Sequence, residues 1–254
     1  MKKSVLVVTV GGSHEPILAA IVHANAEFVV FVCSNDDRLS GTKGSYSQIE
    51  GKGKIIKAAR SDDKPTLGNI PSIAGLRADS FRVVVVDADE LQESYRTIAI
   101  LLDELAIEFR EVICDYTGGT KSMTAALVMA AVQNDKVQLQ VVAGTRTNLE
   151  RVQTANQFVE TAWVGRARFM NQMRYALGFW KSYEYSSSLS HLEMMRPVNA
   201  DDKDAHRRAL TACRAFVAWD VFDHHDAKSR LSLISQNIST VSYTHLTLPT
   251  NREV

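Results

Sequence analysis

Along the first 150 residues, short apolar runs rich in β-branched residues alternate with longer amphipathic stretches. The apolar runs predict strands at residues 5–10, 28–33, 82–86, 112–116 and 137–143. The intervening stretches have helical spacing at residues 15–24, 89–105 and 119–134. Most of the strands are continuous apolar runs, which are typical of strands buried on both faces. The pattern therefore predicts an α/β fold with a doubly wound, mainly parallel, Rossmann-like sheet.

Some local features interrupt this pattern. The segment 35–80 is rich in Gly, Ser, Lys and Asp, and long loops of that kind are uncommon unless they are functional or disordered. A short helix is expected within it, at residues 53–60. Residues 144–148 are a turn-like cluster, which predicts a hairpin with residues 150–154 as its return strand. Asp89, with a glutamine three residues later, is the expected N-cap of its helix.

Beyond residue 163 the spacing becomes helical. Helices are predicted at residues 166–179, 183–195 and 204–222. A break is expected at residues 196–199 and at the Asp201–Asp202 pair. The sequence thus predicts a smaller all-α C-terminal region after the sheet domain, with domains at residues 1–160 and 163–240.

Residues 241–254 are expected to be foreign to the fold. Their first part, from Val241 to Thr250, resembles the translation of a transposase adapter used in sequencing libraries. We therefore leave this tail out of the fold prediction, as one would a fusion scar. On this interpretation the natural protein is truncated here and continues past Thr240; a genuine β-prone tail is the alternative.

Charge balance and cysteine usage narrow the classes of function. Lys+Arg and Asp+Glu both number 29, so no overall positive field attracts nucleic acid. Cys33, Cys114 and Cys213 form no CxxC pair and are expected to be reduced core residues. The first apolar run, residues 4–10, is too short for the apolar region of a signal sequence and is followed by glycines rather than a cleavage site. No other segment approaches membrane-spanning length. We expect a cytoplasmic protein with no membrane partner, no cofactor and no metal site.

Ligands of a parallel sheet gather outside the carboxyl ends of its strands. The first predicted strand is followed there by a glycine-rich loop, Val10-Gly11-Gly12-Ser13-His14-Glu15-Pro16. Glycine lets the backbone approach a ligand closely, and Pro16 suits a first helical turn because its missing N–H costs nothing there. An ordinary tight turn is an equal alternative for this loop taken alone.

A second glycine loop ends the strand at residues 112–116 and opens the next helix, with the sequence DYTGGTKSM at residues 115–123. The helix start favours a phosphate through its free amides and dipole. Thr117, Thr120 and Ser122 add hydroxyl donors, and Lys121 adds a positive charge. Neither loop has the Walker or GxGxxG spacing, so a dinucleotide coenzyme is disfavoured. The second loop predicts an anion cradle of another kind.

The DYTGGTKSM string resembles the most recognisable motif of CARF domains in type III CRISPR systems. Residues 10–13 followed by Pro16, residues 30–34, and residues 87–91 with Tyr95 also resemble one large CARF subfamily in order and spacing. The resemblance covers roughly the first 150 residues, and the two glycine loops are specific in combination.

This resemblance implies a homodimer whose two sensor domains share a pocket for a cyclic oligoadenylate second messenger. By matching position, one wall of the pocket consists of Gly11, Gly12 and Ser13, with Ser34 as a weaker candidate. The other wall consists of Thr117, Gly118, Gly119, Thr120 and Lys121, and Ser122 is a further ligand-binding candidate.

CARF proteins usually join the sensor to a C-terminal effector, often a helical HEPN ribonuclease, which implies an RNA substrate for the C-terminal region. Residues 218–227 resemble the helical part of the same subfamily. HEPN cleavage needs an Arg followed by a His after a gap of four to six residues, and the sequence has no such pair. The catalytic residues therefore stay unknown.

The leading hypothesis is a ligand-gated effector of antiviral defence. Two alternatives remain open. One is a CARF regulator without catalysis. The other is a ring nuclease that degrades the messenger, with Lys121 or Ser13 stabilising the phosphate.

Other polar clusters have simpler interpretations. His224, His225 and Asp226 are neighbours on a helix and cannot converge on a metal by themselves, so a solvated face is favoured. Asp87 and Asp89 end a strand, where helix capping by Asp89 is favoured over acid–base work. A solvated surface is also favoured over a basic lid or a ligand contact for Lys43, Lys52, Lys54, Lys57, Arg60 and Arg146.

Overall fold

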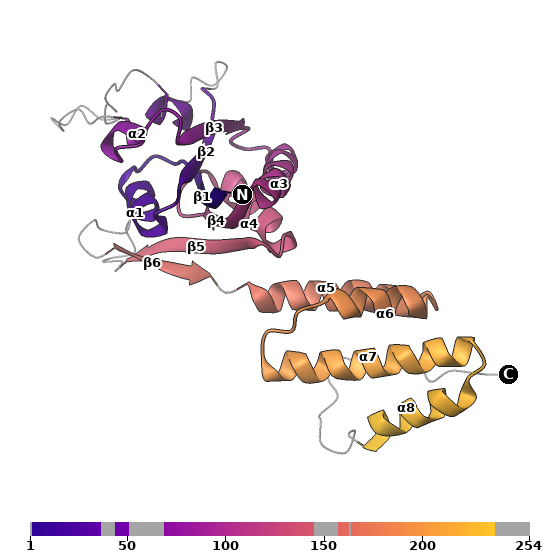
Figure 1. Cartoon of the computed structure of the whole chain (residues 1–254). Coiled ribbons are helices and arrows are strands. Elements are labelled where there is room, and N and C mark those ends of the chain that lie inside the picture. Colours follow the sequence, from indigo (N-terminus) through magenta and orange to yellow (C-terminus); the bar gives the residue numbers. More distant parts are fainter. Residues whose placement is uncertain (1, 37–43, 51–68, 145–156, 163, 237–254) are drawn as a thin grey trace. The chain divides into compact units, whose positions relative to one another are not determined.

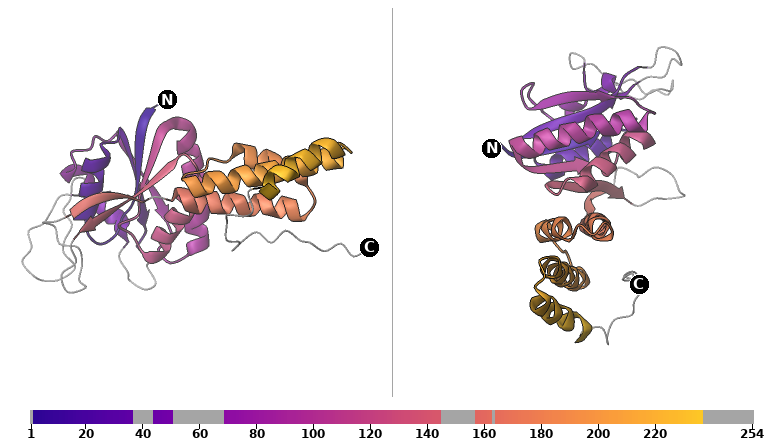
Figure 2. Two further views of the ribbon diagram at one scale, coloured as in Figure 1. Left: turned by 90° about the horizontal axis from the view of Figure 1, so that it is seen from below. Right: turned by 90° about the vertical axis from the view of Figure 1, so that its right-hand side faces the viewer.

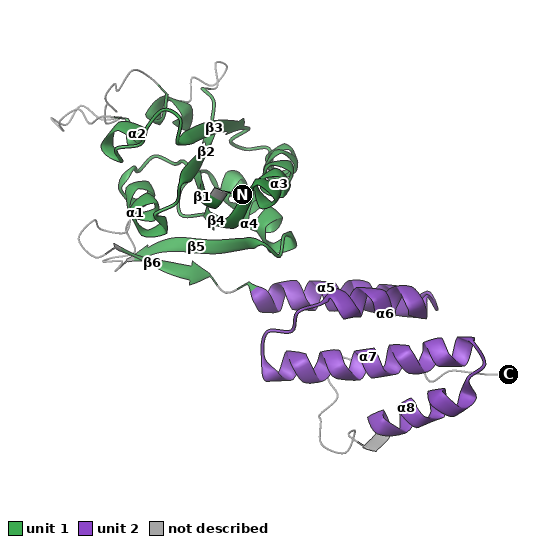
Figure 3. Ribbon diagram, in the orientation of Figure 1, with its two compact units in different colours: residues 1–164 green, residues 165–254 purple. Residues whose placement is uncertain are grey.

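The computed structural model describes residues 2–36, 44–50, 69–144, 157–162 and 164–236 (Figure 1). The chain divides into unit 1, Met1–Val164, and unit 2, Gly165–Val254 (Figure 3). The strands of unit 1 are β1 (Lys2–Thr9), β2 (Phe28–Ser34), β3 (Phe81–Val86), β4 (Phe109–Asp115), β5 (Val137–Gly144) and β6 (Gln157–Ala162). Its helices are α1 (Glu15–Ala24), the 3-10 helix η1 (Ser45–Gln48), α2 (Ile70–Ile73), α3 (Leu91–Glu108) and α4 (Lys121–Gln133).

The six strands form one sheet in the order β3-β2-β1-β4-β5-β6. The pairs from β3 to β5 are parallel, and β6 is antiparallel to β5. The chain runs outward from β1 to β3 and then returns to β4 on the other side of β1, which makes the sheet doubly wound. The predicted Rossmann-like, mainly parallel sheet is therefore confirmed.

Apolar side chains fill a core on each face of this sheet. Val5 and Val7 of β1 belong to the core under α3 and α4, and Leu6 and Val8 belong to the core under α1 and α2. All four are fully buried. Figures 1 and 2 show the sheet between these two sets of helices. Because helices cover both faces, the inner strands need apolar residues at successive positions rather than at alternate ones.

The predicted strands correspond to β1 through β5, with ends that differ by a few residues. The predicted return strand at residues 150–154 and the short helix at residues 53–60 lie outside the described residues. The described return strand is β6, which pairs with β5 from Leu139↔Ala162 to Gly144↔Gln157. Cys33, Cys114 and Cys213 are buried and form no disulfide, as expected.

The predicted N-cap of α3 is wrong. The capping position is Glu90, whose side chain makes no capping hydrogen bond. Asp87 instead binds the backbone before the helix, because its Oδ1 accepts hydrogen bonds from the Asp89 N–H at 2.8 Å and the Glu90 N–H at 3.0 Å. The turn before the helix is thus stabilised by the first aspartate of the segment, not by the second.

Unit 2 consists of helices in its described part, as predicted: α5 (Gly165–Lys181), α6 (Tyr185–Met194), α7 (Ala200–Asp220) and α8 (His224–Gln236). Phe169, Leu192 and Cys213 contribute to a small buried core. Trp180 and Phe216 pack edge to face, with ring centroids 4.7 Å apart. No described helix is long and apolar enough to cross a membrane.

The sequence prediction was wrong at two places in unit 2. The Asp201–Asp202 pair does not break the helix but lies in the first turn of α7. The Asn199 side chain caps that turn by accepting the Asp202 N–H at 2.8 Å, and acidic residues are favourable at a helix start. Helix α8 was not predicted as a separate element, because it buries little more than Ala227 and carries few apolar residues.

Candidate functional site

The two glycine loops lie at the carboxyl ends of adjacent strands. Residues 10–14, the first glycine loop, follow β1, and residues 116–120, the second glycine loop, follow β4. β1 and β4 pair directly, and the helices that follow them, α1 and α4, pack on opposite faces of the sheet. This is the topological switch point of the sheet, where doubly wound folds bind their ligands.

Glycine brings these two loops into direct backbone contact. A Cβ at Gly11 would lie 2.6 Å from the Gly119 nitrogen, and a Cβ at Gly118 would lie 2.4 Å from the Thr9 carbonyl oxygen. Gly119 has φ of +90°, which side-chain-bearing residues rarely adopt. A Cβ at Gly12, in contrast, would meet nothing within 4 Å. Most of these glycines therefore pack the loops together, and Gly12 leaves room on the exposed side.

Hydroxyl groups hold the second glycine loop from within the domain. The Gly118 carbonyl oxygen accepts hydrogen bonds from Thr9 Oγ1 at 2.6 Å and from Thr124 Oγ1 at 2.9 Å. Thr120 is the N-cap of α4, and its Oγ1 accepts the Met123 N–H at 3.2 Å. The loop is therefore fixed by side chains of the same unit.

Asp115 fixes the beginning of the same loop. Its carboxylate is fully buried, with Oδ1 accepting the Thr117 N–H at 3.0 Å and Oδ2 accepting Gln140 Nε2 at 3.1 Å. Burial raises the pKa of Asp115, and the hydrogen bonds from Thr117 and Gln140 partly oppose that rise. The Thr117 Oγ1 in turn accepts the Val142 N–H at 2.7 Å. Thr117 thus ties the loop to β5 with a hydroxyl that the sequence assigned to the ligand.

The start of α4 can receive an anion. Thr120 satisfies the Met123 amide, whereas the amides of Lys121 and Ser122 have no acceptor among the described residues. The Lys121 side chain is exposed and makes no ion pair in the described part of the chain. Open amides, the positive end of the helix dipole and an ammonium group together favour a phosphate.

Two further segments reach the glycine loops. Ser34 is buried at the end of β2, where its N–H donates to Ser45 Oγ at 3.0 Å and its Oγ accepts the Ser45 N–H at 3.2 Å. Gln48, at the end of η1, donates from Nε2 to the Gly11 carbonyl oxygen at 2.6 Å. On the other side, the Thr120 hydroxyl donates to the Ala88 carbonyl oxygen. Ser34 therefore supports η1, which in turn contacts the first loop.

The remaining sequence candidates fall into two groups. The six cations suggested as a lid or ligand contact lie outside the described residues. The His224 ring packs against Trp219 in unit 2, with centroids 4.7 Å apart. Within the described ranges, no group of three His, Cys, Asp or Glu side chains is placed to hold a metal ion.

Sequence reasoning missed the residues that support the loops. Thr9 and Asp115 carry a detectable signal, because each is a polar residue at the carboxyl end of an otherwise apolar buried strand. Gln48 carries no such signal in the sequence, since it lies in a polar segment 37 residues from its partner Gly11.

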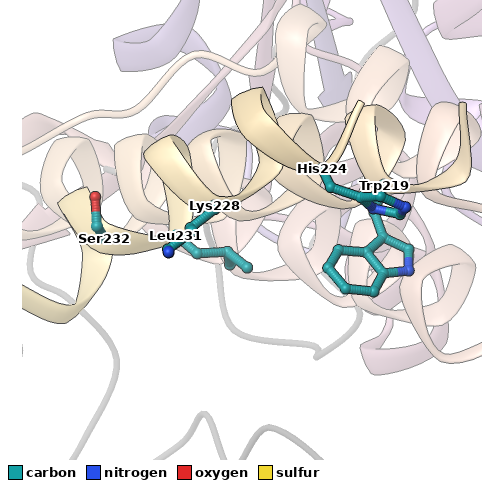
Figure 4. Close-up of a pocket in the computed structure, with 5 residues that line it drawn as sticks. All are labelled: Trp219, His224, Lys228, Leu231 and Ser232. Carbon is teal, nitrogen blue, oxygen red and sulfur yellow. The ribbon is translucent and has the colours of Figure 1, made fainter. Parts of the chain in front are cut away.

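Unit 2 has a pocket of its own, of about 470 Å³ (Figure 4). Its lining comes from the end of α7 and from α8: Trp219, His224, Lys228, Leu231 and Ser232. The surface is mostly apolar and carries none of the glycine-loop features, so it is not part of the candidate site.

Comparison with solved structures identifies the fold. Csm6 of Enterococcus italicus, solved with cyclic hexa-2'-fluoro-hexa-dAMP bound, matches with a TM-score of 0.55 at 12% identity, over 82% of this chain and 52% of that chain. This chain shares its fold with Csm6. It spans about half of the Csm6 chain. The match extends over the Rossmann-like sheet domain and into the helical region.

Two further solved structures match with lower TM-scores. A type III CRISPR defence DNA nuclease activated by cyclic oligoadenylate has a TM-score of 0.41 at 13% identity, over 84% of this chain and 34% of that chain. Can2 from Sulfobacillus thermosulfidooxidans, in complex with cyclic tetra-adenylate, has a TM-score of 0.38 at 11% identity, over 88% of this chain and 68% of that chain. No protein-family model and no curated protein matches the sequence.

Proposed function

We propose that this chain is a sensor of type III CRISPR antiviral defence that binds a cyclic oligoadenylate at its two glycine loops and controls an effector. The observation that carries the proposal is the contact between the loops at the switch point of the sheet, beside the open start of α4. The CARF-like motif at residues 115–123 and the fold shared with the cyclic-nucleotide-bound Csm6 support it.

The chemistry of the loops suits a chain of phosphodiesters. The Lys121 and Ser122 amides and the Lys121 ammonium group receive phosphate oxygens, since such charge-assisted hydrogen bonds are strong. Gly12 and Ser13 form the opposite wall, where the absence of a Cβ at Gly12 leaves space. Gly11, Thr117, Gly118, Gly119 and Thr120 set the backbone around the ligand.

In a ring of repeated adenylates such as the tetra- or hexa-adenylate, one half of the ring presents the same groups as the other half. A homodimer that places two copies of the glycine loops around the ring matches this symmetry. Each ligand then contacts both protomers, so ligand binding and dimer formation strengthen each other by linkage.

The all-α unit 2 is the proposed connection to the effector. RNA is the proposed substrate of that effector. The sequence contains no Arg–His pair with HEPN spacing. We therefore expect the chain to bind the messenger without cutting RNA. Ligand-stimulated RNA cleavage by the chain alone would place catalysis in residues that this proposal treats as structural.

The test is calorimetric titration with cyclic tetra-adenylate and cyclic hexa-adenylate, using linear oligoadenylate as the control ligand. Lys121→Ala should weaken binding about 10- to 100-fold, the range for a lost charge-assisted hydrogen bond. Lys136→Ala is the control, because Lys136 is an exposed lysine just before β5, at the amino ends of the strands and so away from the glycine loops. Its Nζ donates to the Ala106 carbonyl oxygen at 3.2 Å, so its melting temperature is compared with wild type as well. Equal affinity of Lys121→Ala and wild type would overturn the assignment.

Sedimentation with and without the ring tests the shared site, and chromatography of the recovered ligand tests its breakdown. Ligand-promoted dimerisation is expected. Tight binding to a monomer would exclude the shared pocket, and disappearance of the ring would favour a ring nuclease over a sensor.

A further inference from the structure

The first glycine loop receives a hydrogen bond from a distant segment. Gln48 Nε2 lies 2.6 Å from the carbonyl oxygen of Gly11, which is partly buried. A carbonyl oxygen only accepts hydrogen bonds, so the amide nitrogen of Gln48 must face it. The contact therefore constrains the peptide that joins Gly11 to Gly12.

Gln48 is itself held firmly in place. The reciprocal Ser34–Ser45 pair fixes the start of η1, and the Gly44 N–H donates to Asp36 Oδ1 at 2.9 Å. Just beyond η1, Asn69 Nδ2 donates to the Ile49 carbonyl oxygen at 3.0 Å. The amide of Gln48 thus acts from a fixed support rather than from a free side chain.

The oxygen atom of the Gln48 amide is unfavourable for the stability of the protein. Its Oε1 is buried and has no hydrogen-bond partner among the described residues. A buried acceptor without a donor lowers stability, and such groups in native proteins call for an explanation. Folding alone gives little reason for a glutamine here, since a methionine of similar length would fill the space without an orphan oxygen.

The geometry of the held peptide supplies the reason. The described chain has no cis peptide bonds, and in a trans peptide the C=O and the N–H point in opposite directions. With the Gly11 carbonyl directed at Gln48, the Gly12 N–H is directed away from Gln48. Gly12 is exposed, and its N–H has no acceptor in the described ranges. A peptide between two glycines turns over easily, so its direction needs an anchor.

We propose that Gln48 is a positioning residue of the ligand site, which holds the Gly11–Gly12 peptide so that the Gly12 N–H donates to a phosphate of the bound ring. If the peptide turned over, the Gly11 carbonyl oxygen would face the anion instead and repel it. This role rests on the proposed function, and it adds a third segment of the chain to the two glycine loops.

Gln48→Met, Gln48→Glu and Ser47→Ala test the role. Ser47 is exposed in the same 3-10 helix, and its hydroxyl bonds only to the Gly44 carbonyl oxygen among described residues, so it is the matched control. Gln48→Met should keep the melting temperature within about 2 °C of wild type and bind cyclic oligoadenylate about tenfold more weakly. The Gly12 amide resonance should move in the ligand-free Gln48→Met protein and stay in place in Ser47→Ala.

Gln48→Glu adds a pH signature that a packing role would not produce. At pH 7 its carboxylate cannot donate to the Gly11 carbonyl, so binding should be weaker than in Gln48→Met. Near pH 4, below the ordinary glutamate pKa of about 4.3, the protonated carboxyl can donate, so affinity should recover toward the wild-type value measured at the same pH. Equal affinity of wild type and Gln48→Met, or a large drop in its melting temperature, overturns the positioning role. Failure of wild type to bind any ring overturns the proposed function instead.

Discussion

The second glycine loop is held by its own strand, the neighbouring strand and its helix, whereas the first depends on η1, a segment of the same unit that is distant in sequence. Thr9, Thr124 and Asp115 hold the second loop through side chains that belong to its own strand, its neighbour and its helix. The first loop touches the second through Gly11, and the Val10 N–H donates to the Val32 carbonyl oxygen at 2.9 Å. Its Gly11 carbonyl oxygen is held by the side chain of Gln48. The two loops have similar sequences but very different support.

This difference separates two roles for glycine. At Gly11, Gly118 and Gly119 the missing side chain allows backbone to lie against backbone, so these positions define the site before a ligand arrives. At Gly12 the missing side chain leaves open space and permits the peptide to turn. In the proposed ligand site, the second glycine loop would therefore determine where a phosphate binds, and the first glycine loop would determine how tightly it is enclosed.

The largest effect that tests this comparison is on folding. Gly118→Ala would place a Cβ 2.4 Å from the Thr9 carbonyl oxygen, so β1 and the second loop must separate. We expect a loss of about 3 kcal/mol in the free energy of unfolding, measured by urea denaturation. Gly12→Ala meets nothing within 4 Å and should change stability by no more than about 0.5 kcal/mol. Similar losses in both variants would contradict the distinction between the loops.

A smaller effect is expected from the hydroxyl groups on the Gly118 carbonyl. Thr9→Val and Thr124→Val should each cost about 1 kcal/mol, because the other threonine still donates to the oxygen. The double variant should cost more than the sum, since it leaves the carbonyl without either donor. Additive losses in a double-mutant cycle would show that the two hydroxyls act independently.

The sequence was sufficient for the sheet and for both loops, because apolar runs and glycine clusters are local patterns. Ser34 and Thr117 remain predicted ligand residues, and in the structure their hydroxyl oxygens accept the Ser45 N–H and the Val142 N–H. A hydroxyl group looks the same in sequence whether it meets a ligand or a backbone amide. Only the pairing of β4 with β5 and the path of η1 distinguish the two cases.

The support of the first loop could not be predicted for a related reason. Gln48 reaches Gly11 across 37 residues, and no local pattern reports a contact of that range. In unit 2, the Asp201–Asp202 pair was predicted as a break, but Asn199 caps α7 and places both aspartates in its first turn. Tertiary contacts and helix caps determine the support of the first loop and the start of α7, whereas hydrophobic periodicity is enough to predict the strands of the sheet.

A pH-dependent effect separates the loops further. Burial raises the pKa of Asp115, so folding disfavours its charged form. Its contribution to stability is therefore greatest below the ordinary carboxyl pKa of about 3.9 and is lost as pH rises through the raised value. Asp115→Asn keeps an acceptor for the Thr117 N–H, and the Gln140 amide can turn over to accept from the new NH₂ group. Its melting temperature relative to wild type should rise between pH 4 and pH 8; a constant difference would show that the charge is not penalised.

The smallest effect concerns local opening beside the first loop. Burial raises the pKa of the Cys33 thiol to about 12, although a hydrogen bond with Ser45 opposes the rise, so almost no thiolate exists at pH 8 in the closed state. Labelling by iodoacetamide must then await local opening of η1. Ser45→Ala removes the hydroxyl that accepts the Ser34 N–H, while the Ser45 N–H can still donate to Ser34 Oγ. This loss should speed Cys33 labelling severalfold, as followed by peptide mass spectrometry. Cys114, in β4 beneath the second loop, should label at an unchanged rate. Equal acceleration at both cysteines would mean that the two loops open together, and the first would then have no separate support.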